Sequence, residues 1–271
     1  MSTRWLSRLG EILLLALAAS CGGGGPGPEA GTGPPEGTRT TSVITSRHTG
    51  ISYTYQVFLP AGYAQGTARY PVVYAADGEY RFPVLSSAIE ASRRNLILVN
   101  VWHMGTSRRF VDFTLPGAEA YHRFLTQELV PEIDALYRTD VASRAYSGHS
   151  LSGEFALFAL FLERPGQRTF NTIISGEGSF WARPDGSFDS ALGDTGLALE
   201  REMFTRDRSL PVTLVLAGDI LANGPRVAQV HDYLAARGYT GLRLDHRSYG
   251  LGHLPMDGPS FIDALAFAYG P

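Results

Sequence analysis

The residue with the clearest capacity for chemistry is Ser150, in the string YSGHSLSG that covers residues 146–153. This string lies between a short apolar segment, 145–147, and an apolar run, 155–162, that predicts a helix. A sharp turn from a buried strand into a helix lifts a serine hydroxyl above the sheet, where it can act as a nucleophile. Ser152 stands where the usual Gly-x-Ser-x-Gly pattern has its second glycine. Because serine is small, we expect strain at this turn and not its failure.

A serine hydroxyl is a poor nucleophile at neutral pH, so a general base must lie within hydrogen-bond reach. Among seven histidines, His253 has the most suitable position, in the loop YGLGH between the last predicted strand and the last predicted helix. His103 ends another predicted strand and is a candidate for lining the pocket. Structural or solvent-exposed roles are expected for the other five, which are His48, His122, His149, His231 and His246.

A carboxylate must orient the histidine and stabilise its protonated form. The chain order nucleophile, acid, histidine directs attention to the strand 211–217, which Asp219 follows. Asp219 is therefore the predicted acid. Asp232 and Asp245 remain alternatives, although the first is more typical of a helix surface and the second of a strand.

The negative oxygen of a tetrahedral intermediate needs two backbone N–H donors held in place beforehand. Leu151, which directly follows the serine, is expected to provide one of them. The loop after Ala76, which begins Asp77-Gly78-Glu79, is expected to provide the other.

The elements that must position these residues alternate between strands and helices. Predicted strands cover residues 51–59, 71–76, 96–102, 145–147, 211–217 and 242–249. Predicted helices cover residues 121–137, 155–162, 226–236 and 260–269, with Pro131 expected to kink or divide the first. The alternation predicts an α/β fold with a mostly parallel central sheet and helices on both faces. In such sheets ligands bind beyond the carboxyl ends of the strands.

These motifs together resemble the esterase family of the α/β-hydrolase fold that includes enterochelin esterases, S-formylglutathione hydrolases and mycolyltransferases. The matching strings are YPVVYAADGE (70–79), RFVDFT (109–114), FL (124–125), ELVP (128–131), YRT (137–139) and GHSLSG (148–153). The resemblance extends over roughly residues 42 to 270. It implies the triad Ser150, Asp219 and His253, and an oxyanion hole formed by the N–H groups of Glu79 and Leu151. It also implies that Arg109 and Asp112 lie near the pocket rim, where a structural ion pair is an equal alternative.

The leading functional hypothesis is a serine hydrolase that cleaves small-molecule carboxylic esters through an acyl-enzyme. The alternatives are an acyltransferase of the mycolyltransferase type and a catalytically inactive, surface-anchored binding protein. Candidates for substrate binding are Trp102, His103, Arg108, Arg109 and Trp181. The residues after Trp181 show no amphipathic helix that could cover a long acyl chain, so a short or polar acyl group is expected. The resemblance makes a siderophore-type polyester one candidate.

Composition excludes several other classes of function. A formal charge of −3 gives no electrostatic footprint for nucleic acid. The 23 basic residues are all arginine, which excludes a phosphate-loop lysine, a Schiff-base lysine and a Ser-x-x-Lys nucleophile. No His-x-His, His-Glu-x-x-His or cysteine cluster occurs, so we expect neither a metal nor a cofactor.

The first twenty residues have the organisation of an export signal, with Arg4 and Arg8, then the apolar run 12–19, then small residues up to Cys21. The apolar run is too short to span a bilayer, which needs about 20 apolar residues. Cys21 is the only cysteine, so no intramolecular disulfide can form.

The string LAASC, residues 17–21, resembles the lipobox of bacterial lipoproteins, in which the cysteine carries the lipid. Ala18 departs from that pattern, so ordinary secretion is the alternative. Residues 21–41 are rich in glycine and proline and predict a flexible tether. We therefore expect a catalytic domain over 42–271, exported to the periplasm or cell surface and lipid-anchored to the membrane.

Overall fold

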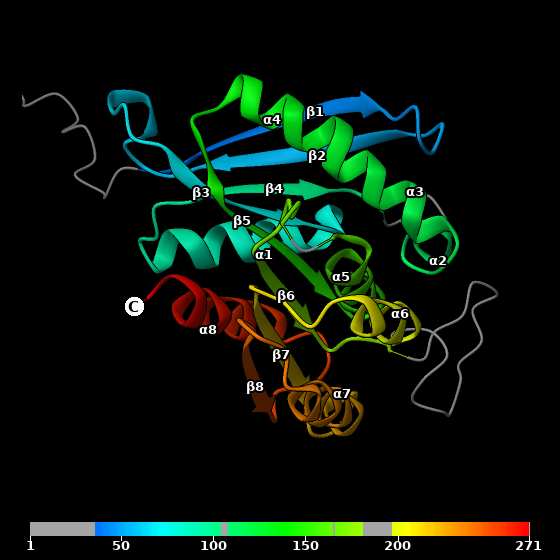
Figure 1. Ribbon diagram of the computed structural model, residues 1–271. Coiled ribbons are helices and arrows are strands. Elements are labelled where there is room, and N and C mark those ends of the chain that lie inside the picture. Colours follow the sequence, from blue (N-terminus) through cyan, green and yellow to red (C-terminus); the bar gives the residue numbers. More distant parts are fainter. Residues whose placement is uncertain (1–35, 104–107, 165, 181–196, 271) are drawn as a thin grey trace, which may run out of the picture. The chain divides into compact units, whose positions relative to one another are not determined.

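A single sheet of eight strands organises the part of the chain that the computed structural model describes, residues 36–103, 108–164, 166–180 and 197–270 (Figure 1). The strands are β1 (Thr38–Thr45), β2 (Ser52–Leu59), β3 (Tyr70–Ala75), β4 (Ile97–Val101), β5 (Thr139–His149), β6 (Thr172–Gly176), β7 (Thr213–Asp219) and β8 (Arg243–Tyr249). Their order across the sheet is β1-β2-β4-β3-β5-β6-β7-β8. The pairs β1–β2 and β2–β4 are antiparallel, and every later pair is parallel. The predicted α/β fold with a mostly parallel sheet is confirmed.

The central strands are apolar because both of their faces are buried. Along β3, Val72 and Tyr74 point into one hydrophobic cluster, whereas Val73 and Ala75 point into the other. Successive side chains of a strand point to opposite faces, so a continuous apolar run suits a sheet that is covered on both sides.

Helices cover both faces of this sheet (Figure 1). They are α1 (Gly78–Ala91), α2 (Arg109–Asp112), α3 (Gly117–Phe124), α4 (Val130–Leu136), α5 (Leu151–Leu162), α6 (Ala198–Arg206), α7 (Gly224–Arg237) and α8 (Asp257–Tyr269). Apolar side chains of α1 and α8 fill the cluster on one face, and those of α3, α5 and α7 fill the cluster on the other. None of the helices in the described ranges is long and apolar enough to cross a bilayer.

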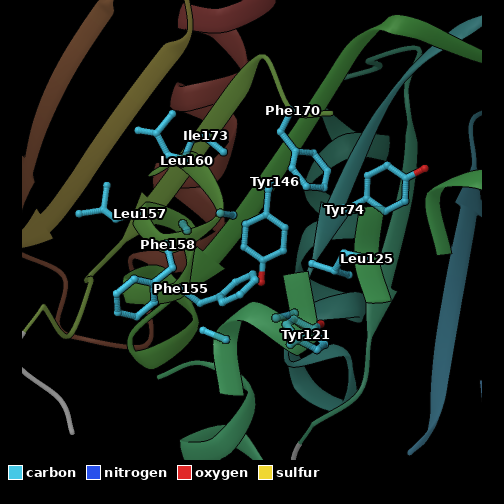
Figure 2. Packing of buried hydrophobic residues seen from close by; sticks show 14 of the residues in the cluster. Tyr74, Tyr121, Leu125, Tyr146, Phe155, Leu157, Phe158, Leu160, Phe170 and Ile173 are labelled. Atoms are coloured by element: carbon cyan, nitrogen blue, oxygen red, sulfur yellow. The ribbon is translucent and has the colours of Figure 1, made fainter. Parts of the chain in front are cut away.

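Helix α5 is apolar on every side because neighbours enclose it. Figure 2 shows Phe155 of this helix against Tyr146 of β5 and Tyr121 of α3. The ring centroids of Phe155 lie 5.2 Å from Tyr146 and 5.0 Å from Tyr121, both in edge-to-face arrangements. Truncating such a buried aromatic ring to alanine typically costs about 3–5 kcal/mol. This packing fixes the helix that follows Ser150.

Five of these strands and helices were not predicted from the sequence, among them the four-residue helix α2. β1 is an exposed edge strand without a buried face, and it begins at Thr38, inside the range 21–41 expected to form the tether. β6 has only five residues. Helix α1 starts at Gly78, where we expected a loop, and α6 is a nine-residue helix without a strong apolar stripe.

Pro131 does not divide the predicted helix over 121–137. A π-helical turn, Leu125–Leu129, joins α3 to α4, and Pro131 occupies the first turn of α4. A proline is tolerated in a first helical turn because its missing N–H would have no intrahelical partner there.

Both ends of the described chain reach the carboxyl end of α1. The N–H of Gly37 donates to Glu90 Oε1 at 2.7 Å. Arg94, just after α1, donates from Nη1 to the Gly270 carbonyl at 2.9 Å. Thr38 pairs with Leu59, so β1 begins at the edge of the sheet where the parallel strands also begin. The two ends therefore lie at the amino edge of the parallel strands.

Candidate active site

Ser150 occupies a strained turn at the carboxyl end of β5. Its φ of 60° and ψ of −121° lie in a region that residues with a Cβ rarely adopt. The Ser150 N–H donates to the Gly176 carbonyl at 2.9 Å, which ties the turn to β6. A Cβ on Gly148 would come within 1.8 Å of the Ser152 carbonyl oxygen, so only glycine fits there. The turn has the form of a nucleophile elbow.

Ser152 is accommodated in the first turn of α5 without a positive φ. Its buried Oγ accepts the N–H of His149 at 2.9 Å and lies 2.8 Å from Asp77 Oδ2. We expected backbone strain at Ser152, but the residue with a strained backbone is Ser150. The departure from Gly-x-Ser-x-Gly gives no structural reason for an inactive elbow.

His253 lies in the loop between β8 and α8, where it meets a carboxylate that the sequence did not indicate. Its Nδ1 is 2.8 Å from Glu177 Oε2, and about a third of its side chain is exposed. Its ring packs edge-on against that of His149, with centroids 5.0 Å apart, which places it beside the elbow. Within the described residues, Ser150 Oγ contacts the Ser179 hydroxyl at 3.4 Å.

Glu177 directly follows β6 and is fully buried, with a φ of 50°. Its carboxylate also accepts the N–H groups of Asp219 and Asn223, and the Asn223 side chain donates to its carbonyl at 2.8 Å. Burial alone would raise the pKa of the Glu177 carboxyl. The hydrogen bonds from His253 and the two N–H groups outweigh burial, so the pKa lies below its usual range. Glu177 is therefore held as an anion against the imidazole.

Among the described residues, the carboxylate bonded to His253 is that of Glu177 and not that of Asp219, the predicted triad acid. The Asp219 carboxylate accepts the N–H of Leu221 at 3.0 Å and those of Leu251 and Gly252, both at 2.7 Å. Burial would raise its pKa, but the three backbone donors hold the pKa below its usual value. Asp219 thus anchors the loop that carries His253.

The two alternative acids also lie away from the imidazole of His253. Asp232 is exposed on α7 and pairs with His231, and Asp245 on β8 pairs with Arg247. The sequence did not point to Glu177 because it follows β6, and the string TIISG of that strand has only two large apolar residues.

Two helix N-termini meet beside Ser150. Helices α1 and α5 follow β3 and β5, which are adjacent and parallel, with Ala75 opposite Ser147. Glu79 and Leu151 lie in the first turns of these helices, where N–H groups point outward without intrahelical acceptors and the helix dipole is positive. This is a favourable environment for a developing negative charge.

The candidate substrate-binding residues lie in different surroundings. Trp102 lies against the start of α1, because a Cβ on Gly78 would come within 2.5 Å of the Trp102 Cδ1. His103 is fully buried, with its ring edge-on to Tyr121 at 4.9 Å, so it belongs to the core and not to the rim. Burial lowers its pKa. Trp181 lies outside the described residues, as does Cys21.

Arg108 and Arg109 form two separate ion pairs. Arg108 Nη2 is 2.6 Å from Asp112 Oδ1, and Arg109 Nε is 2.7 Å from Asp77 Oδ1. Arg109 and Asp112, which the resemblance grouped at the pocket rim, therefore have different partners. No group of three or more His, Cys, Asp or Glu residues in the described ranges could hold a metal ion.

Comparison with known proteins identifies the family. The model of the family described as Putative esterase matches residues 46–209. The ferri-bacillibactin esterase BesA of Bacillus subtilis (strain 168) is 26% identical, over 80% of this chain and 86% of its own. An IroE-like serine hydrolase from Shewanella oneidensis superposes with a TM-score of 0.71 at 23% identity, over 85% of this chain and 79% of that chain. The siderophore hydrolase EstA from Aspergillus nidulans gives a TM-score of 0.70 at 18% identity, over 84% and 93% of the two chains. The chain belongs to the Putative esterase family and is a carboxylic ester hydrolase of the α/β-hydrolase fold.

Proposed function

We propose that the chain cleaves esters through an acyl-enzyme on Ser150, with His253 as general base and Glu177 as the carboxylate that orients it. The observation that carries this proposal is the 2.8 Å contact between His253 Nδ1 and a buried Glu177 carboxylate, next to a serine in a strained elbow. Strain of this kind persists only where the surrounding structure enforces it, and it concentrates at functional sites.

The mechanism follows from the hydrogen bond to Glu177. Because the Nδ1–H group of His253 donates a hydrogen bond to that carboxylate, the neutral imidazole has its lone pair on Nε2. Nε2 accepts the Ser150 proton as Oγ attacks the ester carbonyl, and the N–H groups of Glu79 and Leu151 stabilise the resulting oxyanion. The protonated imidazole then gives its proton to the leaving alcohol. Water, activated by the same nitrogen, releases the acid from Ser150.

Covalent labelling tests this assignment directly. A fluorophosphonate probe should modify Ser150, as read by mass spectrometry, and Ser150→Ala should lose the label and lower kcat by several orders of magnitude. Ser179→Ala is the matched variant, because the Ser179 hydroxyl lies 3.4 Å from Ser150 Oγ. It should still be labelled at Ser150. A label found on Ser179, or near wild-type activity in Ser150→Ala, contradicts the proposal.

For the substrate, we propose a soluble ester with a short or polar acyl group, of which siderophore esters are the leading class. The support is the naming of the relatives as siderophore hydrolases and ferri-siderophore esterases. Four exposed aliphatic side chains in the two loops around His253 offer an apolar surface for part of such a ligand: Ile220, Leu221, Leu251 and Leu254. Values of kcat/KM for nitrophenyl esters from acetate to palmitate test the acyl preference. A maximum at palmitate contradicts it.

We also propose that the enzyme is exported and held to a membrane by lipid on Cys21. The support is the order of features in the sequence: basic residues, a short apolar run, small residues, a single cysteine, and then a segment rich in glycine and proline.

A further inference from the structure

A buried polar network joins the two helix starts that flank Ser150. Its members are Asp77, which precedes α1, Ser152 in the first turn of α5, and Arg109 at the start of α2. Arg109 binds Asp77 with two bonds, Nε to Oδ1 at 2.7 Å and Nη2 to Oδ2 at 3.1 Å. Ser152 Oγ lies 2.8 Å from the same Oδ2. Asp77 and Ser152 are both completely buried.

The Ser152 hydroxyl links the elbow to the turn before α1. It accepts the N–H of His149, and two acceptors lie within reach of its single proton, the His149 carbonyl at 2.9 Å and Asp77 Oδ2 at 2.8 Å. The charged carboxylate is the stronger acceptor of the two. Asp77 has a φ of 60° and makes no capping bond to its own helix, so its carboxylate serves the neighbouring elements instead. A glycine at position 152, as in the usual pattern, could not form this link. The serine therefore adds a direct bond between the two segments that carry Glu79 and Leu151.

Charge is the second property of this network. Asp77 precedes Glu79 by two residues, and it is hydrogen-bonded to Ser152, which directly follows Leu151. An unbalanced carboxylate at this place would oppose the negative charge that develops on the substrate oxygen. Arg109 balances it through a bidentate ion pair, and removing one partner of a buried pair leaves a costly uncompensated charge.

We propose that Ser152, Asp77 and Arg109 are positioning residues that set the separation and the electrostatic field of the oxyanion hole. Arg109 thus acts through Asp77, not by binding the substrate. This inference rests on the proposed function of Ser150, and it extends that proposal to residues that do not touch the reacting atoms.

The first test is Ser152→Ala, which removes the hydroxyl and leaves the ion pair and backbone intact. We expect kcat to fall between about tenfold and a hundredfold, with KM within about twofold, because the N–H donors lose their fixed spacing. The inhibition constant of an aryl trifluoromethyl ketone, which forms a tetrahedral adduct, should rise in proportion. The melting temperature reports any general loss of structure. A kcat within about twofold of wild type overturns the proposal.

The second test compares Arg109→Gln with the double variant Asp77→Asn/Arg109→Gln. The single variant leaves the Asp77 charge unbalanced, so kcat should fall at least about tenfold with little change in KM. The double variant removes both charges, and asparagine tolerates the positive φ at this position, so kcat should recover by about tenfold. Arg39→Gln is the control, because Arg39 forms an ion pair with Glu90 at the far end of α1.

The outcomes separate this inference from the proposed function. If Arg109→Gln raises KM and leaves kcat unchanged, Arg109 contacts the substrate and the inference is wrong. If the kcat of the double variant is no higher than that of Arg109→Gln, Arg109 does not act by balancing the charge of Asp77, and the inference is wrong. Should Ser150→Ala keep its activity, the proposed function fails. Should Ser150→Ala be inactive while Ser152→Ala and Arg109→Gln keep the kcat of wild type, only the present inference fails.

Discussion

Replacing Glu177 by glutamine isolates the charge that holds the His253 imidazole. Glutamine keeps the size of the side chain and an oxygen acceptor for Nδ1, but it removes the negative charge. At the observed 2.8 Å and an effective dielectric constant of about 20, the attraction between this carboxylate and a protonated His253 is about 6 kcal/mol. That energy corresponds to roughly four orders of magnitude in rate. Since the glutamine oxygen retains part of the interaction, we expect kcat to fall by about 10³ to 10⁴.

The assay is hydrolysis of nitrophenyl acetate at neutral pH, with the melting temperature measured in parallel. Asp219→Asn is the matched variant, because its amide would face the N–H groups of Leu251 and Gly252, which now donate to the carboxylate. It should lower the melting temperature and lower kcat less than Glu177→Gln does. The assignment of Glu177 would be refuted if Glu177→Gln kept nearly the kcat of wild type while Asp219→Asn lost most of its kcat without a lower melting temperature.

Three further predictions concern stability and anchoring. Burial lowers the pKa of His149 to about 4, and an unfolded histidine titrates near 6.5, so the unfolded state binds more protons in acid. The free energy of unfolding should therefore fall by about 3 kcal/mol between about pH 6.5 and pH 4. His149→Phe should flatten that slope in urea titrations, and an unchanged slope contradicts the reasoning. Asp257→Asn leaves buried Arg81 without its anionic partner, whose carboxylate lies 2.8 Å away. The change should cost about 3–5 kcal/mol in denaturant unfolding, and a cost below about 1 kcal/mol contradicts this reasoning. Lipidated protein should enter the detergent phase and Cys21→Ala should not, so equal partitioning argues against the anchor.

The fold was predictable where burial leaves a local pattern. The strand that ends at Ala75 and the helix after Ser150 are apolar runs because neighbours cover them on all sides, and such runs are visible in the sequence. β1 has no buried face, and β6 has only two large apolar residues, Ile173 and Ile174, so both were missed. A local pattern reports the burial of an element and not the identity of its neighbours.

The same limit explains which site residues were predicted. Ser150 and His253 stand in turns whose glycines are visible in the sequence. Glu177 reaches His253 from a segment 76 residues away, and no local spacing records that contact. His103 lies two residues after the end of β4, and Tyr121 and other residues distant in the sequence bury it.

The position of the two ends of the described chain has a practical consequence. Gly37 and Gly270 are both bonded to residues at the carboxyl end of α1, whereas Ser150 lies at the opposite edge of the sheet, where the parallel strands end. Residues 37 and 270 therefore lie at the end of the sheet opposite to the one that carries Ser150. Attachment at residue 37 or 270 should leave access to Ser150 open, and a short linker between these two residues would give a circular permutant of the described domain without crossing the site.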